Sequence, residues 1–188
     1  MKKTALFINL TKKTAEQSWL DQEVENPKTK NKVKVSSLPP KERERYRPKS
    51  DIVPAIDRGQ LSVLHHPDIA TTIINKQGDT ALHYAAKKGM NVTSHPEAAK
   101  VRNKNEETPL HILSQHSMAA KLKSIKNDLL KHPAISKVKD YDGRTPLHNL
   151  AEQHIPEAFD HPDSNKVRDF FGMAPSVYKT IPDYWGRR

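Results

Sequence analysis

Residues 78–89 read GDTALHYAAKKG, and the related segment TPLH occurs at residues 108–111 and again at 145–148. Further columns come into register when the chain is aligned on Thr80, Thr108, Thr145 and Ala174. Five residues before these anchors stand Asn75, Asn103, Asp140 and Asp169, and seven before them stand Ile73, Val101, Val138 and Val167. A His-Pro pair precedes every unit, at residues 66–67, 95–96, 132–133 and 161–162. The chain therefore contains an internal repeat, with spacings of 28, 37 and 29 residues between anchors.

The residue types in these columns predict a tight turn followed by a helix in each unit. Asn or Asp bonds its own backbone in such a turn, and Gly78, Gly143 and Gly172 accept positive φ. Threonine supplies an oxygen that caps a helix, and the following proline tolerates its missing N–H. One unit alone would leave its apolar face in water, so we expect stability to come from stacking.

The two TPLH segments and residues 78–89 resemble the ankyrin repeat family, and the resemblance covers roughly residues 51–180. It implies helix–loop–helix units stacked side by side, with a hairpin finger projecting between successive units. The expected fold is an all-α, ankyrin-type helical solenoid with an extended N-terminal arm. Residues 51–188 would form the repeat domain, with about three full repeats plus terminal half-repeats, and residues 1–50 a basic arm of low order.

The repeats depart from the family pattern in ways that predict local differences. We expect a full second helix over 117–130, an abbreviated one at 155–159, and a shortened or absent one after Gly89. Ser117 and His154 replace the glycine expected between helices, and Glu106 replaces the turn glycine, so the second finger is expected to be irregular. Residues 51–64 are expected to form a short helix, a glycine turn and a second helix, and residues 174–178 a helix start only, as atypical terminal units.

Net charge is uneven along the chain, which carries +10 in all. Residues 1–50 hold 13 Lys and Arg against 6 Asp and Glu, whereas the other 138 residues hold 19 against 16. A basic arm suggests an acidic protein surface or nucleic acid, and a solvated, solubilising tail is the alternative. Within it, residues 6–10 could form a strand or dock on a partner, 14–24 could form a short helix, and Phe7 and Trp19 are candidate anchors.

Composition and motifs argue against several classes of protein. The 188 residues include no cysteine, no apolar run long enough to span a bilayer and no convincing secretory leader. We therefore expect a cytoplasmic protein that does not associate with a membrane. No nucleophile elbow, phosphate loop or paired-histidine metal motif occurs, so we expect no catalysis, metal or cofactor. The resemblance implies that His83, His111 and His148 brace the fingers by hydrogen bonds.

Two surfaces are candidates for partner binding. The finger cations flank valine on both sides and would form a basic ladder of Lys100, Arg102, Lys137, Lys139, Lys166 and Arg168. The resemblance also implies an inner helix face, here Tyr84, Lys87, Lys88, Ile112, Gln115, Asn149, Glu152 and Gln153. The favoured function is a non-catalytic protein–protein interaction module whose partner has an acidic surface. A structural component of a virion or nucleoprotein particle, and a nucleic-acid-binding protein acting through its arm, are the alternatives.

Overall fold

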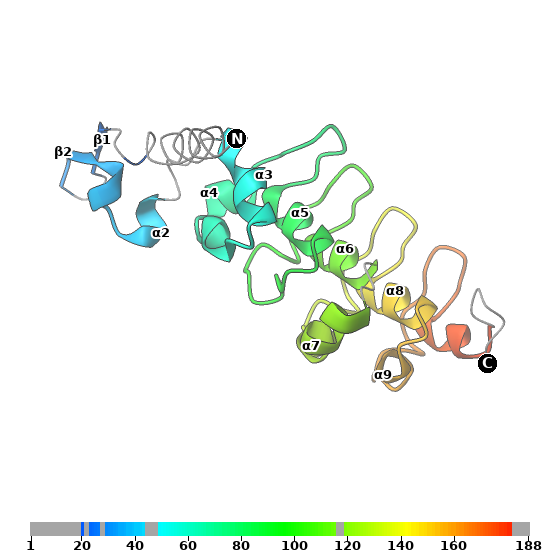
Figure 1. Cartoon of the computed structure of the whole chain (residues 1–188). Coiled ribbons are helices and arrows are strands. Elements are labelled where there is room, and N and C mark those ends of the chain that lie inside the picture. Colours follow the sequence, from blue (N-terminus) through cyan, green and yellow to red (C-terminus); the bar gives the residue numbers. More distant parts are fainter. Residues whose placement is uncertain (1–19, 21–22, 27–28, 44–48, 116–118, 182–188) are drawn as a thin grey trace, which may run out of the picture. The chain divides into compact units, whose positions relative to one another are not determined.

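A computed structural model describes residues 20, 23–26, 29–43, 49–115 and 119–181. The chain divides into two compact units, Met1–Ile69 and Ala70–Arg188, which are described separately below (Figure 1). A short helix, α4 (Pro67–Ala70), spans the boundary between them. No helix in the described ranges is long and apolar enough to cross a membrane.

The first unit contains an antiparallel hairpin of β1 (Glu23–Glu25) and β2 (Lys32–Lys34). Glu23 lies opposite Lys34 and Glu25 opposite Lys32, with a Val24–Val33 pair between them. Directly opposed residues of unlike charge stabilise such a pair, as does contact between β-branched side chains. The predicted all-α solenoid class is therefore wrong, because the chain is mixed and includes a two-stranded sheet. The helix predicted over 14–24 is also wrong at its end, where Val24 lies in a strand.

The rest of the first unit is built from short helical segments. A 3-10 turn, η1 (Val35–Ser37), precedes α2 (Pro40–Arg43), and Val35 and Leu38 are buried. Next come α3 (Lys49–Asp57) and η3 (Leu61–His65), joined through Gly59 at φ +79°. The predicted helix, glycine turn and second helix over 51–64 are thus present, with a 3-10 second element.

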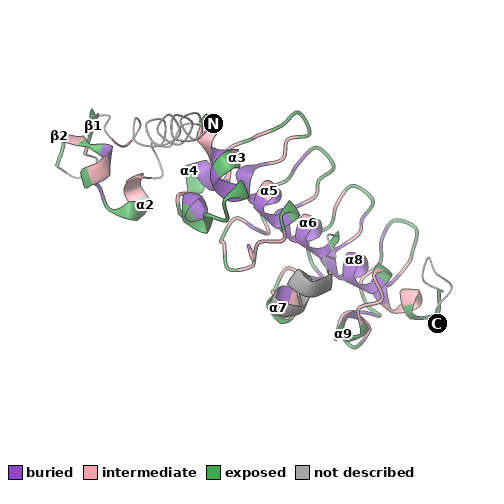
Figure 2. Ribbon diagram, viewed as in Figure 1, coloured by how far each residue is buried: buried purple, intermediate pink, exposed green. Residues whose placement is uncertain are grey.

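In the second unit the first helices of successive repeats pack against one another in chain order. They are α5 (Ala81–Lys87), α6 (Pro109–Gln115), α8 (Pro146–Glu152) and the 3-10 helix η4 (Pro175–Lys179). Figure 1 shows them in a row, with loops projecting on one side. Leu82, Leu110 and Leu147 are fully buried between them, along the purple stretches of Figure 2. The repeated leucine therefore forms the core of these units.

Second helices vary from repeat to repeat as the sequence predicted. The full one is α7 (Ala119–Leu130), and the abbreviated one is α9 (Pro156–Phe159), which packs on α8. Residues 91–100, all of them described, contain turns but no helix. Ile125 and Leu129 of α7 are buried, and their spacing of four residues places them on one face of the helix.

The projecting loops are named fingers 1 to 4 and comprise residues 71–79, 99–107, 136–144 and 165–173. The prediction that finger 2 is irregular is wrong. Glu106 adopts φ +59°, close to the φ +75° of Gly143, and its N–H bonds the Asn103 carbonyl at 3.0 Å. Gly143 bonds Asp140 at the same distance. The shared turn bonds hold Glu106 in a conformation that costs roughly 1–2 kcal/mol.

His154 also adopts positive φ, at +53°, where the repeat pattern would have glycine. Its N–H bonds the Ala151 carbonyl at 2.9 Å, and its ring lies edge-on to Phe159 with 6.3 Å between centroids. These contacts compensate for the strain at this position. Ser117, the other replacement of that glycine, lies outside the described residues.

Candidate functional site

Backbone hydrogen bonds join the tips of the four fingers into a ladder. The N–H groups of Lys104, Tyr141 and Phe170 donate to the carbonyls of Gln77, Asn105 and Asp142, at 2.9, 3.1 and 3.0 Å. Each bond runs from one tip to the tip before it. Adjacent fingers are therefore held in register at their exposed ends, which pre-organises the side chains there.

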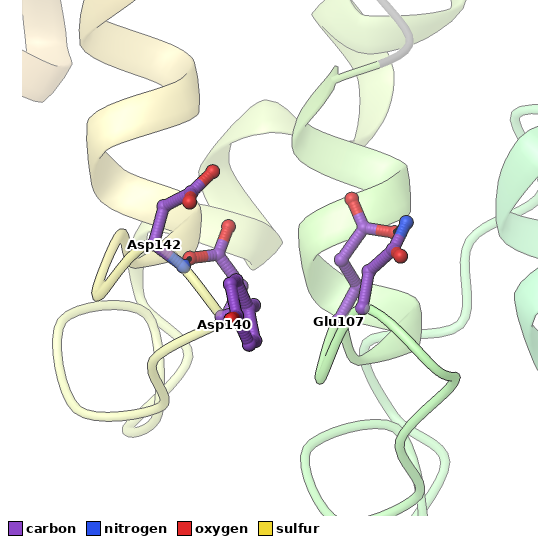
Figure 3. A pocket seen from close by; sticks show the side chains of 5 residues that line it. Glu107, Asp140 and Asp142 are labelled. Carbon is purple, nitrogen blue, oxygen red and sulfur yellow. Dashed lines mark hydrogen bonds between the residues drawn. The ribbon is translucent and has the colours of Figure 1, made fainter.

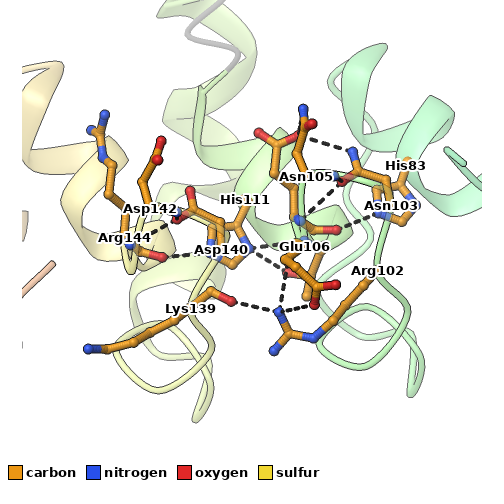
Figure 4. A network of polar contacts seen from close by, with 12 residues as sticks. His83, Arg102, Asn103, Asn105, Glu106, His111, Lys139, Asp140, Asp142 and Arg144 are labelled. Carbon is orange, nitrogen blue, oxygen red and sulfur yellow. Dashed lines mark hydrogen bonds and ion pairs between the residues drawn. The ribbon is translucent and has the colours of Figure 1, made fainter. Parts of the chain in front are cut away.

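Buried histidines hold the bases of the fingers together (Figure 4). His111 Nδ1 lies 3.1 Å from the Thr108 N–H, which donates to it, so Nε2 carries the proton. That Nε2–H donates to the Arg144 carbonyl of the next finger at 3.1 Å. His83 and His148 repeat the arrangement, with Glu107 and Met173 supplying the carbonyls.

Burial lowers the pKa of His83, His111 and His148 below the ordinary histidine value. A proton added at Nδ1 would also face the threonine N–H that this nitrogen now accepts. Both effects favour the neutral imidazole, whose two nitrogens are used in bracing the fingers. Among the described residues, no group of His, Asp and Glu is arranged to hold a metal ion.

One column of the predicted basic ladder ties neighbouring fingers together. Arg102 Nη1 donates to the Lys139 carbonyl at 2.6 Å and to the Glu106 carbonyl at 2.8 Å (Figure 4). Lys139 Nζ donates in the same way to the Arg168 carbonyl, at 2.8 Å. Arg168 then bonds the Gly172 carbonyl within finger 4, at 3.2 Å. These three cations use their donors on finger backbone.

The other column of the ladder behaves differently. Lys100 pairs with Glu97 at 3.0 Å and Lys166 with Asp163 at 3.4 Å, each with a partner three residues earlier in a turn. Lys137 is exposed. Exposed pairs of this kind contribute little to stability. The sequence predicted the positions of Arg102 and Lys139 but not their carbonyl partners, because those belong to the next finger.

The predicted inner face is divided between surface and interior. Asn149 is buried, and its amide donates to Ser114 Oγ at 3.2 Å. Gln153 donates to the Ser114 carbonyl, so both side chains join α8 to α6. Ile112 is half-buried. Asn149 and Gln153 therefore act between helices, and the sequence alone could not distinguish them from a free surface.

The remaining inner-face residues are accessible but engaged. Lys88 Nζ lies 5.2 Å above the ring centre of the half-buried Tyr84, while Lys87 is exposed. Gln115 donates to Glu107 Oε1 at 2.7 Å, and Glu152 pairs with Arg144 at 2.5 Å.

An acidic hollow of about 300 Å³ lies between fingers 2 and 3, and sequence reasoning missed it (Figure 3). Its lining consists of Asn105, Glu107, Asp140, Tyr141 and Asp142. The carboxylates of Glu107 and Asp140 accept hydrogen bonds from neutral donors, respectively the Gln115 and Asn103 amides and the backbone N–H groups of residues 142 and 144. Across the described part of the chain, no ion pair involves the three carboxylates.

Aromatic side chains project from the tips next to this hollow. Tyr141 of finger 3 is 74% exposed, and Phe170 and Phe171 of finger 4 are 73% and 81% exposed. Phe170 leans against Gly143 so closely that an added Cβ there would lie 2.6 Å from its ring. A repeat alignment could have revealed these tips, because fingers 1 and 2 have Lys-Gln at 76–77 and Lys-Asn at 104–105 in the same columns.

The candidate arm anchors Phe7 and Trp19 lie outside the described residues.

No protein-family model matches the chain, and no curated protein matches it significantly in sequence. What the protein binds must therefore be inferred from its own residues.

Proposed function

We propose that this protein is a non-catalytic protein–protein interaction module built on ankyrin-like repeats, which contacts its partner through the finger tips and the adjoining inner face. The observation that carries the proposal is the exposure of three aromatic side chains, Tyr141, Phe170 and Phe171, on neighbouring tips. Aromatic residues are enriched in the cores of protein interfaces, where they bury large areas.

The rigidity of the tips strengthens this proposal. The tip ladder and the histidine braces fix the backbone beneath the aromatic side chains, so binding need not order a loose loop. Association then loses less conformational entropy, and more of the contact energy becomes affinity. If the same aromatic side chains lay on a mobile loop, ordering that loop on binding would lower the affinity.

Charge at the tips favours a protein partner over nucleic acid. Glu107, Asp140 and Asp142 would repel phosphates brought to the aromatic rings. The +7 charge of residues 1–50 remains a second, separate candidate contact, for an acidic surface. If it contributes, removing residues 1–50 will weaken binding and high salt will reproduce most of the loss, because salt screens exposed charges.

Site-specific photo-crosslinking in the native host or its lysate tests the proposal. A photoreactive phenylalanine analogue replaces Phe171 in one sample and the exposed Lys131 in the control. Lys131 directly follows α7, a helix that lies on the side away from the fingers (Figure 1). We expect one protein adduct of defined mass from position 171, retained after nuclease treatment, and none from 131. The captured protein, once purified, should lose about tenfold or more in affinity when Tyr141, Phe170 and Phe171 become serine.

Two results would remove the proposal. One is the absence of a protein adduct at position 171 when the protein is folded and the analogue is incorporated. The other is an adduct that disappears after nuclease treatment, which would indicate a nucleic-acid partner.

A further inference from the structure

We infer that the tips of fingers 3 and 4, together with the acidic hollow, bind a segment of a partner protein in which an apolar side chain lies next to a lysine or arginine. This inference rests on the proposed protein-binding function and specifies the chemistry of the partner. The surface binds a segment that is both basic and apolar, and it does not bind an acidic or uncharged segment.

The apolar half of the surface is formed by the rings of fingers 3 and 4. Phe171 is 81% exposed, so most of its ring is open to a partner. Phe170 leans against Gly143, and Lys139 Nζ lies 6.0 Å from its ring centre while bonding the Arg168 carbonyl. One cation already lies over Phe170, which leaves Phe171 and Tyr141 as the rings that best accept an apolar side chain.

The charged half is the hollow itself. Glu107 and Asp140 have their oxygens oriented by amide and backbone N–H groups, none of which neutralises their charge. Asp142 lines the same hollow and is exposed. Tyr141 adds an aromatic face to the lining, and a lysine or arginine head is attracted to both carboxylates and ring faces. A cation entering here would meet negative charge in a protein that is otherwise strongly basic.

The apolar and charged halves lie side by side because the backbone hydrogen bonds between the finger tips link them. The Phe170 N–H bonds the carbonyl of Asp142, and the Tyr141 N–H bonds the carbonyl of Asn105 on the far side of the hollow. Rings and carboxylates thus come from neighbouring fingers held in one register. Neighbouring side chains of a single extended segment could reach both.

The repeats supply matched variants for the test. Asp140→Asn with Asp142→Asn removes two charges and installs the residues that finger 2 already has at 103 and 105, including the acceptor oxygen of the turn. Phe170→Lys with Phe171→Gln installs the residues of finger 1 at 76 and 77. Both double variants should therefore retain the wild-type circular dichroism spectrum and thermal midpoint.

The probe is a displayed library of random dodecapeptides selected on the full-length protein, followed by affinity measurement on synthetic copies of the enriched peptides. We expect enrichment of peptides with an apolar residue within two positions of Lys or Arg. The best peptide should bind each double variant about tenfold more weakly than wild type, and high salt should weaken binding to wild type more than binding to the Asn variant, which keeps only the Glu107 charge in the hollow. A control variant, Lys131→Ala, should bind as wild type does.

Enrichment of acidic or uncharged peptides, affinity that is equal on wild type and both double variants, or the absence of any enriched peptide would each overturn the inference. Those outcomes leave the photo-crosslinking result unchanged if the protein binds a partner by other chemistry. A failed crosslink at position 171 together with failed selection would remove both.

Discussion

Replacing His111 with leucine should destabilise the second unit, because two backbone groups lose their hydrogen-bond partner. The imidazole is fully buried and makes hydrogen bonds to two backbone groups, the Thr108 N–H and the Arg144 carbonyl. Leucine fills similar space but satisfies neither. The Thr108 N–H is buried and would lose its partner, at a cost of about 1–3 kcal/mol, and the partly buried carbonyl would add somewhat less. We expect a loss of about 2–4 kcal/mol in the free energy of unfolding.

The same substitution should alter the response to acid. Burial lowers the pKa of His111 in the folded state, so the unfolded chain binds more protons as pH falls below the ordinary histidine value near 6.5. The stability associated with this group is therefore complete above that value and is lost as pH falls through the folded pKa. His83 and His148 act in the same direction. The leucine variant should be less stable at neutral pH and lose less stability on acidification than wild type.

Urea denaturation followed by circular dichroism, repeated between pH 7.5 and the pH at which the protein begins to unfold, measures both effects. His65→Leu provides the control, because that histidine is exposed, and it should change the free energy of unfolding by about 0.5 kcal/mol or less. A decrease below about 1 kcal/mol for His111→Leu, with an unchanged acid response, would refute the bracing role assigned to the imidazole.

Four other substitutions test the packing and turns of the repeats by the same denaturation assay. Leu147→Ala removes a fully buried side chain and should cost about 2–5 kcal/mol, whereas a loss near zero would contradict its place in the core. Gly172→Ala and Gly143→Ala should each cost about 1 kcal/mol because φ is +76° and +75°, and Gly143→Ala should cost more because its Cβ must displace Phe170. Equal losses would show that the ring gives way freely. Glu106→Gly should gain about 0.5–1 kcal/mol by relieving positive φ, and a loss would mean that its 3.5 Å pair with Arg102 matters more than strain.

The sequence by itself determined the repeat, the turn-and-helix content of each unit and the uneven second helices. These follow from local chemistry: a threonine before proline starts a helix, Asx-x-x-Gly makes a turn, and buried leucines recur at fixed offsets. The hairpin that contradicts the all-α expectation also has a local signal. Charged residues alternate with valine in EVE at 23–25 and in KVK at 32–34, and the two strands carry opposite charges.

Only the tertiary structure decided which of these residues are free to meet a partner. Arg102 and Lys139 belong to the predicted basic ladder, yet their side chains donate to carbonyls 37 and 29 residues further along the chain. Asn149 was predicted to lie on the surface, yet it is buried and bonds Ser114 of α6. The acidic hollow likewise takes Glu107 from one finger and Asp140 from the next. Stacking brings together groups that are distant along the chain, and their distances depend on how adjacent units pack, which no local pattern encodes.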